Sequence, residues 1–260
     1  MLKPKGPQET EYIFGIPKTY IYNNYVRGHR DGIYFEFVLN SKIENNLSEK
    51  NLRYGLHFMY SDSDEYLNNI FQKNGAGIAV MYSKNIKMYK NKYIYNSGPA
   101  NYGLLLKEIV NSELKDNLFY KNTFGIYMED SNRTLFENNT FRENGIGIKL
   151  LANCENNIFR KNNFINNIFD VTTNSRQNYG NLFTENYWSN YRGFDLNKDG
   201  YGDIPYKPVT LSSYLFEKYP LLFILLKSFF IYLIDLAESQ IPTLTPIDMK
   251  DQKPSLKVWR

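Results

Sequence analysis

Apolar and polar residues follow a pattern that recurs about every 22 residues between Gly32 and Phe164. Each unit opens with a glycine, which is followed by an apolar, a variable and a second apolar residue. The opening glycines are Gly32, Gly55, Gly77, Gly103, Gly125 and Gly147, at spacings of 23, 22, 26, 22 and 22 residues. A repeat of this regularity predicts a stack of equivalent structural units.

Two apolar columns in the repeat predict a short strand in every unit. The residues one position after each glycine are Ile33, Leu56, Ile78, Leu104, Ile126 and Ile148, and those three positions after it are Phe35, Phe58, Val80, Leu106, Met128 and Leu150. Alternation with a period of two places both columns on the same face of a strand. We expect that face to point inward.

An asparagine and an aromatic residue mark one corner of each unit. The asparagines are Asn46, Asn69, Asn91, Asn117, Asn139 and Asn162, and the aromatic residues two positions later include Phe71, Tyr93, Phe119, Phe141 and Phe164. In stacked coils, equivalent residues lie about 4.8 Å apart, so the aromatics should form a continuous core and the asparagines should hydrogen-bond along the stack. The sequence therefore predicts an all-β fold, a right-handed parallel β-helix with about 22 residues and three short strands per coil.

The repeat and its flanks predict five segments. Residues 1–18 form a lead-in, 19–192 the parallel β-helix, 193–210 an Asp-rich loop, 211–240 an apolar helical segment and 241–260 an extended tail. The apolar run within 211–240 is interrupted by Lys227 and is too short to span a bilayer. It either caps the last coil, lies in a membrane interface or docks on a membrane partner, and its residues leave these three alternatives open.

Composition narrows the function classes only a little. The net charge of +4 arises from 31 basic and 27 acidic residues that are interleaved, so there is no footprint for nucleic acid. The single cysteine, Cys154, excludes an internal disulfide framework and a multi-cysteine metal cluster. The N-terminus carries no apolar run of signal-peptide length.

The outward positions of the predicted strands contain a candidate metal site. Met59 and Met81 stand at equivalent positions of neighbouring coils, and His57 precedes Met59 by two residues on the same face. Thioether sulfur together with imidazole nitrogen is a ligand set that selects copper(I). The alternative is that a loop or a partner covers both methionines and that they only pack.

The Asp-rich loop contains a second candidate metal site. Asp195, Asn197, Asp199 and Asp203 occupy positions 1, 3, 5 and 9 of a calcium loop, with Gly200 at position 6. Tyr206 stands where the bidentate glutamate of such a loop belongs. The loop therefore either binds calcium or forms an Asx-rich turn.

Catalysis on a β-helix would require an acid and a base close together on one face. The candidate outward carboxylates are those of Glu36, Glu108, Glu129 and Asp130, of which only Glu108 and Asp130 stand at equivalent positions of successive coils. We therefore predict that the protein is not an enzyme. A carbohydrate-binding or carbohydrate-cleaving β-helix is the alternative.

Several segments of the sequence resemble the NosD family of periplasmic β-helix proteins. The most specific are His-Phe-Met-Tyr-Ser at 57–61 and Asn-Tyr-Trp-Ser at 186–189, and the similarity extends from about Asn24 into the apolar C-terminal segment. Members of this family are longer at the N-terminus, where they carry a signal peptide and further coils.

The resemblance implies an exported, non-enzymatic partner of an ABC transporter. Such a protein works with the permease, the ATPase and a copper lipoprotein to supply copper to nitrous oxide reductase in the periplasm. The resemblance also implies that the apolar segment docks on the permease, next to the membrane. The candidate docking residues are Leu221, Leu222, Phe223, Leu225, Leu226, Phe229 and Phe230.

Overall fold

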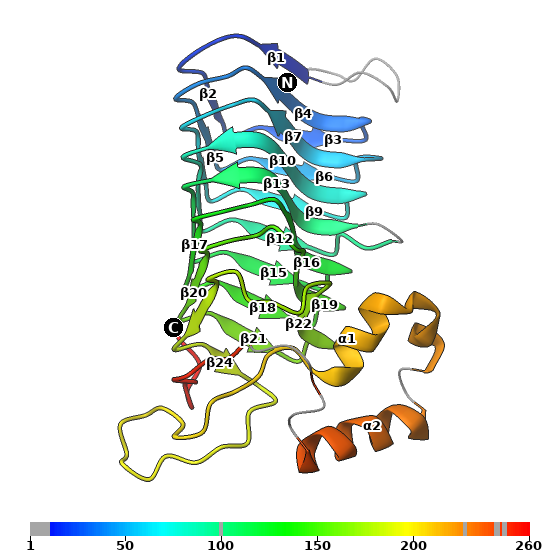
Figure 1. The fold of residues 1–260 in the computed structure, drawn as a ribbon. Coiled ribbons are helices and arrows are strands. Elements are labelled where there is room, and N and C mark those ends of the chain that lie inside the picture. The colour runs from blue at the N-terminus through cyan, green and yellow to red at the C-terminus, as the bar shows by residue number, and fades with distance from the viewer. Residues whose placement is uncertain (1–10, 99–100, 226–227, 242–244, 246–248) are drawn as a thin grey trace.

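The structure is a computed structural model that describes residues 11–98, 101–225, 228–241, 245 and 249–260. These residues wind into a parallel β-solenoid with three sheets of eight strands each (Figure 1). Each coil contributes one strand to each sheet, and the strands of one sheet pair in parallel with those of the adjacent coils. The predicted parallel β-helix is therefore confirmed.

The strands are short, and their bounds repeat with the sequence period. The first sheet contains β1 (Glu11–Phe14), β4 (Asp31–Glu36), β7 (Tyr54–Met59), β10 (Ala76–Lys84), β13 (Tyr102–Val110), β16 (Phe124–Glu129), β19 (Ile146–Leu150) and β22 (Phe169–Thr173). The second contains β2 (Tyr20–Tyr22), β5 (Lys42–Glu44), β8 (Glu65–Leu67), β11 (Lys87–Tyr89), β14 (Glu113–Lys115), β17 (Leu135–Glu137), β20 (Ile158–Arg160) and β23 (Leu182–Thr184). The third contains β3 (Tyr25–Arg27), β6 (Leu47–Glu49), β9 (Ile70–Gln72), β12 (Lys92–Ile94), β15 (Leu118–Tyr120), β18 (Thr140–Arg142), β21 (Asn163–Ile165) and β24 (Tyr187–Trp188).

The first coil begins earlier than the sequence pattern indicates. Strand β1 pairs with β4, with Glu11 opposite Ile33 and Ile13 opposite Phe35. Part of the predicted lead-in, residues 1–18, thus belongs to the solenoid, and residues 1–10 lie outside the described residues. The repeat was missed here because Thr10 stands where the other units have their opening glycine.

Asparagines hydrogen-bond along the stack as predicted. In each step the Nδ2 group of one asparagine donates to Oδ1 of the next, at 2.9–3.2 Å. We call this series the first asparagine ladder, and its members are Asn24, Asn46, Asn69, Asn91, Asn117, Asn139, Asn162 and Asn186. Because these amides are buried from Asn46 onward, the ladder satisfies polar groups that would otherwise destabilise the interior.

A second ladder of buried asparagines runs beside the first. Its members are Asn51, Asn74, Asn96, Asn122, Asn144 and Asn167. The backbone N–H of each member donates to Oδ1 of the next at 3.0–3.1 Å. The sequence analysis missed this ladder, although its asparagines recur 19 residues after the opening glycines and only Asn167 is shifted by one.

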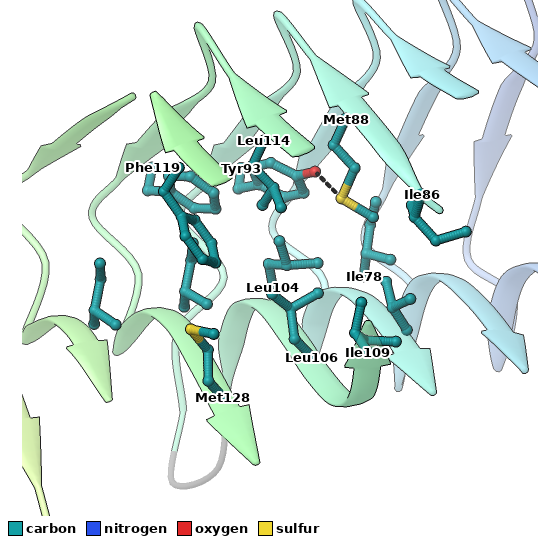
Figure 2. Packing of buried hydrophobic residues seen from close by; sticks show 14 of the residues in the cluster. Ile78, Ile86, Met88, Tyr93, Leu104, Leu106, Ile109, Leu114, Phe119 and Met128 are labelled. Atoms are coloured by element: carbon teal, nitrogen blue, oxygen red, sulfur yellow. Dashed lines mark hydrogen bonds between the residues drawn. The ribbon is translucent and has the colours of Figure 1, made fainter. Parts of the chain in front are cut away.

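The aromatic column forms a continuous stack inside the solenoid. Ring centroids of successive members lie 4.2–5.7 Å apart, and the stacked residues are Phe71, Tyr93, Phe119, Phe141, Phe164 and Trp188. Figure 2 shows the same core near its middle, where the Tyr93 hydroxyl donates to Met88 Sδ at 3.6 Å. Met128, which the pattern assigns to the inward face, is fully buried.

The C-terminal tail closes the last coil. Asp251 Oδ2 accepts hydrogen bonds from the backbone N–H and Nδ2 of Asn186 and from Trp188 Nε1, each at 3.0 Å. The Asn167 Nδ2 of the second ladder donates to Asp170 Oδ1 at 3.1 Å. Each ladder therefore ends on a buried carboxyl group, which accepts a hydrogen bond from Nδ2 of its last asparagine.

The apolar segment folds into α1 (Leu211–Lys218), a 3₁₀ helix (Pro220–Leu225) and α2 (Phe229–Gln240) beside the last coils (Figure 1). The Thr210 side chain caps α1 by accepting from the Ser213 N–H at 3.1 Å. Phe216 of α1 and Ile231 of α2 pack on Ile146 and Phe169. The segment thus covers the C-terminal end of the outer face of the first sheet, whereas Tyr206, Val209 and Met249 join the core. Among the described residues, no helix is long and apolar enough to span a membrane.

Candidate functional site

The predicted copper ligands lie on the outer face of the first sheet, in its N-terminal half. Strands β7 and β10 pair so that Met59 stands opposite Met81 and His57 stands opposite Ala79. Both methionines are partly exposed, in contrast to the buried Phe58 and Val80 beside them. The fold therefore places the two thioethers on adjacent strands, with the imidazole two residues away on the same face.

His57 is buried without a hydrogen-bond partner. The residue is only 6% exposed, and neither Nδ1 nor Nε2 has a hydrogen-bond partner. Burial, helped by the nearby Arg53 charge, lowers the pKa of His57 to about 4, so the imidazole is neutral at pH 7. A buried polar group of this kind costs stability unless a ligand uses it.

These donors fit copper(I). A neutral imidazole offers a nitrogen lone pair, and the two thioethers offer soft sulfur, which is the chemistry that copper(I) prefers. Divalent metals find less support, because no three His, Cys, Asp or Glu side chains in the described part of the chain are placed to hold an ion together. Cys154 is buried, and burial raises the pKa of its thiol to about 11, so the free thiol is protonated at pH 7.

An aromatic row lies next to the methionines, at the corner where the first sheet ends. The Phe37 and Tyr60 rings stack at 5.2 Å and the Tyr60 and Tyr82 rings at 4.9 Å, both with interplanar angles of 11°. The Phe14 and Phe37 rings are nearly perpendicular, with centroids 5.6 Å apart. Because the ring faces are turned toward one another, the row presents mainly edges to solvent and is poorly suited to stacking against a sugar ring.

Two of the four candidate catalytic carboxylates have partners. Glu129 pairs with Lys107 at 3.1 Å across neighbouring coils, and Glu36 accepts from the Tyr34 hydroxyl at 3.3 Å. Glu108 and Asp130 occupy equivalent corners with left-handed backbone, at φ values of 53° and 48°. Glu108 and Asp130 thus stand at a turn that successive coils repeat, where the residues at the same position are Phe37, Tyr60 and Tyr82.

The Asp-rich loop forms Asx turns. Asp195 accepts hydrogen bonds from the N–H groups of Asp199 and Gly200 at 3.1 and 2.9 Å, and Asn197 accepts from Asp199 at 3.0 Å. Asp203 accepts from the Leu196 N–H at 2.6 Å. The oxygens that the calcium prediction assigned to an ion thus hold the backbone of the loop, and the calcium prediction finds no support in the structure.

The predicted docking residues divide into two sets. Leu221, Phe229 and Phe230 are exposed, whereas Leu222 and Leu225 turn inward and pack on the cluster around Phe216. The side chain of Phe223 and all of Leu226 lie outside the described residues. Five further exposed apolar residues of the segment were not among the predicted ones: Tyr219, Ile224, Tyr232, Leu233 and Leu236. Ile224 is the most exposed large apolar residue described, at 86%.

A cavity of about 710 Å³ lies between the last coil and α2. Its lining includes Phe169, Tyr206 and Ile231 together with the carboxyl groups of Asp170 and Asp235. Burial raises the pKa of Asp170 to about 6, and the Tyr206 hydroxyl lies 3.5 Å from its Oδ2 atom. The sequence gives no sign of this cavity, because residues far apart in the chain line it.

Comparison with known proteins identifies the family of this chain. A family model described as "Periplasmic copper-binding protein (NosD)" matches residues 5–193. A protein from Stutzerimonas stutzeri described as "Probable ABC transporter binding protein NosD" is 27% identical over 197 residues, which are 69% of this chain and 44% of that protein. A protein from Pseudomonas aeruginosa with the same description is 28% identical over 174 residues, or 61% of this chain and 41% of that protein. The chain thus spans less than half the length of these relatives.

Solved structures with a similar fold include two enzyme modules from Azotobacter vinelandii. The A-modules of the mannuronan C-5 epimerases AlgE4 and AlgE6 both superpose with a TM-score of 0.58, at 17% and 16% identity. The superpositions cover 65% and 66% of this chain and 53% and 52% of those modules. At this identity the likeness concerns the β-helix fold alone.

Proposed function

Because the chain belongs to the NosD family of periplasmic copper-binding proteins, we propose that it is a non-enzymatic accessory protein of a copper-related ABC transporter. In this proposal it acts outside the cytoplasm and supports maturation of the copper sites of nitrous oxide reductase. Its partners are the permease and ATPase of the transporter and a copper lipoprotein. The family match over residues 5–193 is the observation that carries the proposal.

His57, Met59 and Met81 are the copper(I) ligands in this proposal. The unpartnered nitrogens of His57 and the opposed positions of Met59 and Met81 support this assignment. Copper(I) would be cargo here, and the protein would hold it without redox chemistry. The thioethers lie at the surface, so a copper-carrying partner can reach them before it reaches the buried imidazole.

The exposed apolar side chains of 219–236 are the proposed dock for the permease. Leu221 and Ile224 project from the 3₁₀ helix, while Phe229 and Phe230 project from the start of α2. Lys149 and Glu217 form an ion pair of 2.9 Å that, with the packing of Phe216, fixes the segment on the solenoid. An exposed apolar surface on a firmly anchored element is typical of a protein interface next to a membrane.

Copper(I) titration tests the ligand assignment. The wild type and a His57→Ala, Met59→Ala, Met81→Ala variant would compete anaerobically with a chromophoric copper(I) chelator. A Lys107→Ala, Glu129→Ala variant is the control, because it alters the positions equivalent to Met59 and Met81 two coils further on. We expect one copper(I) site in the wild type and the control and none in the triple variant. Equal binding by all three proteins would remove the assignment.

Co-purification with the transporter tests the dock. The transporter, with permease and ATPase expressed together, would be captured through a tag on the wild type or on a Leu221→Ser, Phe229→Ser variant. Leu196→Ser is the control, since Leu196 is a similarly exposed leucine in the Asp-rich loop. We expect the double variant alone to lose the transporter, and retention by that variant would contradict the dock.

Carbohydrate binding or cleavage is the second candidate function. Tyr20, Tyr22 and Tyr25 of the first coil are all more than half exposed, and such rings are suited to sugar contacts. A glycan array and a reducing-end assay with polysaccharides test this role. Signals that disappear in a Tyr22→Ala, Tyr25→Ala variant would favour it over the copper function.

A further inference from the structure

We propose that Tyr34 and Tyr54 form a cover over the His57 imidazole, that the Arg53–Asp31 ion pair holds this cover shut, and that opening it controls access to His57. Control of copper(I) binding by this cover rests on the proposed function. The enclosure of His57 does not. The cover itself follows from contacts among five side chains that neighbouring coils bring together: Asp31, Tyr34, Arg53, Tyr54 and His57.

Two tyrosine rings enclose the imidazole. The Tyr34 ring, from the preceding coil, meets the His57 ring edge to face with centroids 4.9 Å apart. The Tyr54 ring, from the same strand as His57, lies at the same centroid distance and is tilted by 45°. Since His57 is almost fully buried and its nitrogens contact no hydrogen-bonding group, an incoming metal ion must displace a ring to reach them.

Arg53 clamps Tyr54 in place. Its guanidinium lies over the Tyr54 ring, 4.8 Å from the centroid. The same guanidinium makes a two-point ion pair with Asp31, in which Nε lies 2.8 Å from Oδ1 and Nη2 contacts Oδ2. Asp31 Oδ1 also accepts from the Tyr54 N–H at 3.4 Å. Asp31 is buried, so this carboxylate is a fixed anchor for the cover.

The cover is confined to the two coils that surround His57. In the next coil, Ala76 stands opposite Tyr54 and is preceded by Gly75, so that coil supplies neither a ring nor a charge at these positions. The outward position opposite His57 in that coil is Ala79. Tyr102 and Tyr127 contact each other in the same two columns further along the face, where there is no histidine. The Arg53–Asp31 ion pair, in contrast, coincides with the one imidazole on this face, which favours a role of this pair at His57.

Carbethoxylation of histidine tests the cover directly. The chain contains only two histidines, and His29, which is partly exposed, serves as an internal reference for the reaction with diethyl pyrocarbonate. Peptide mass spectrometry would follow both residues in the wild type, Tyr54→Ala, Arg53→Gln and Tyr54→Phe. Tyr102→Ala is the control, because Tyr102 packs on Phe124 and Tyr127 of the same face, two coils away from His57.

We expect His57 to react at least tenfold more slowly than His29 in the wild type, in Tyr54→Phe and in the control. The ratio should rise about tenfold in Tyr54→Ala and by a smaller factor in Arg53→Gln. Near-ultraviolet circular dichroism identifies any variant that has lost its fold, and only folded variants are compared. Equal reactivity of the two histidines in the wild type, or an unchanged ratio in both folded variants, would overturn the proposal.

Stopped-flow copper(I) binding separates the cover from the copper function. The association rate should rise in Tyr54→Ala while the affinity changes little, because the ligands are retained. If the labelling responds as expected but neither protein binds copper(I), the cover stands and the copper function fails. If copper(I) binds at the same rate in both proteins, with the labelling ratio unchanged, the cover fails and the copper function stands.

Discussion

The two halves of the outer face of the first sheet have one backbone register and two different environments. In the C-terminal half, Ile146 and Phe169 are buried under Phe216 and Ile231 of the helical segment. In the N-terminal half, within the described residues, His57 is enclosed by tyrosines of its own sheet, and Met59 and Met81 remain partly exposed. The column of His57 thus carries a candidate ligand at one end of the face, whereas at the other end its member Lys149 attaches the helical segment through Glu217.

This difference shows what the repeat determines and what it leaves free. The inward columns are apolar in the six coils from Ile33 to Leu150 because the core requires it, so they carry no functional information. The outward column two residues after the glycine changes from His57 to Ala79 to Lys149 without any change in the strand pairing. Function in such a fold must therefore be sought among the outward residues.

Removal of the main anchor in the C-terminal half should have the largest effect. Phe216→Ala deletes a buried ring that packs on Phe169, with centroids 5.2 Å apart. We expect the free energy that holds the helical segment on the solenoid to fall by about 3–5 kcal/mol. Hydrogen exchange of residues 211–218 measures this loss, and copper(I) affinity should stay unchanged. A loss of copper(I) binding in this variant would contradict the separation of the two halves.

The pH dependence of stability should reveal the carboxyl group at the end of the second ladder. Burial raises the pKa of Asp170 to about 6, above its value of about 4 in the unfolded chain. The folded state therefore binds this proton more tightly, so stability is lost as the pH rises from about 4 to 6. Asp170→Asn should abolish this loss, making the variant more stable than the wild type above pH 6 by a margin on the order of 2 kcal/mol. Denaturant unfolding at pH 4, 5 and 7 measures it, and parallel pH profiles of the two proteins would exclude it.

Single substitutions of the methionines should weaken copper(I) binding without affecting the fold. Met59→Ala or Met81→Ala removes one of the proposed ligands, and we expect an affinity loss of about tenfold, which corresponds to about 1.4 kcal/mol. Leu151→Ala, in the same outward column of the C-terminal half, is the control. Chelator competition gives the affinities. An equal loss in Leu151→Ala would show that the effect is not specific to the N-terminal half.

The ion pair between Lys149 and Glu217 should contribute least. The two groups lie 2.9 Å apart, and their side chains are 17% and 15% exposed, so solvent only partly screens them. We expect a coupling free energy of about 1 kcal/mol or less. A double-mutant cycle with Lys149→Ala and Glu217→Ala, followed by denaturant unfolding at two salt concentrations, measures it. A coupling near zero would leave apolar packing and the hydrogen bond from Arg176 Nε to the Tyr214 hydroxyl as the attachment among the described residues of this half.

The sequence was sufficient for the solenoid because its determinants are local and repeat. The opening glycines, the inward columns and the asparagines that begin at Asn46 each recur at a fixed spacing, so the register followed from counting. The second ladder could have been found in the same way, since Asn51 and its equivalents recur at their own fixed spacing. The early start of the first coil was missed because Thr10 interrupts the pattern.

Contacts between distant segments could not be predicted in this way. Asp251 lies 65 residues beyond its partner Asn186, and no periodicity connects them. The position of the helical segment beside the sheet, away from the end of the core, depends on how Phe216 fits Ile146 and Phe169. For the candidate site, the pattern predicted the outward direction of His57, Met59 and Met81, but the enclosure of His57 depends on the side-chain orientations of Tyr34 and Tyr54.

The asparagine ladders give the solenoid a direction. From amide to amide, every donation in the first ladder runs toward the C-terminal end, while the second N–H of each Nδ2 from Asn46 onward returns to a backbone carbonyl of the preceding coil. The amide chain itself therefore has a donor at its C-terminal end and an acceptor at its N-terminal end. Two such solenoids could be fused into one continuous core only head to tail, because two C-terminal ends would confront donor with donor. In such a fusion the acceptor that Asp251 now supplies would instead be the first asparagine of the added module, and the tail would no longer be needed.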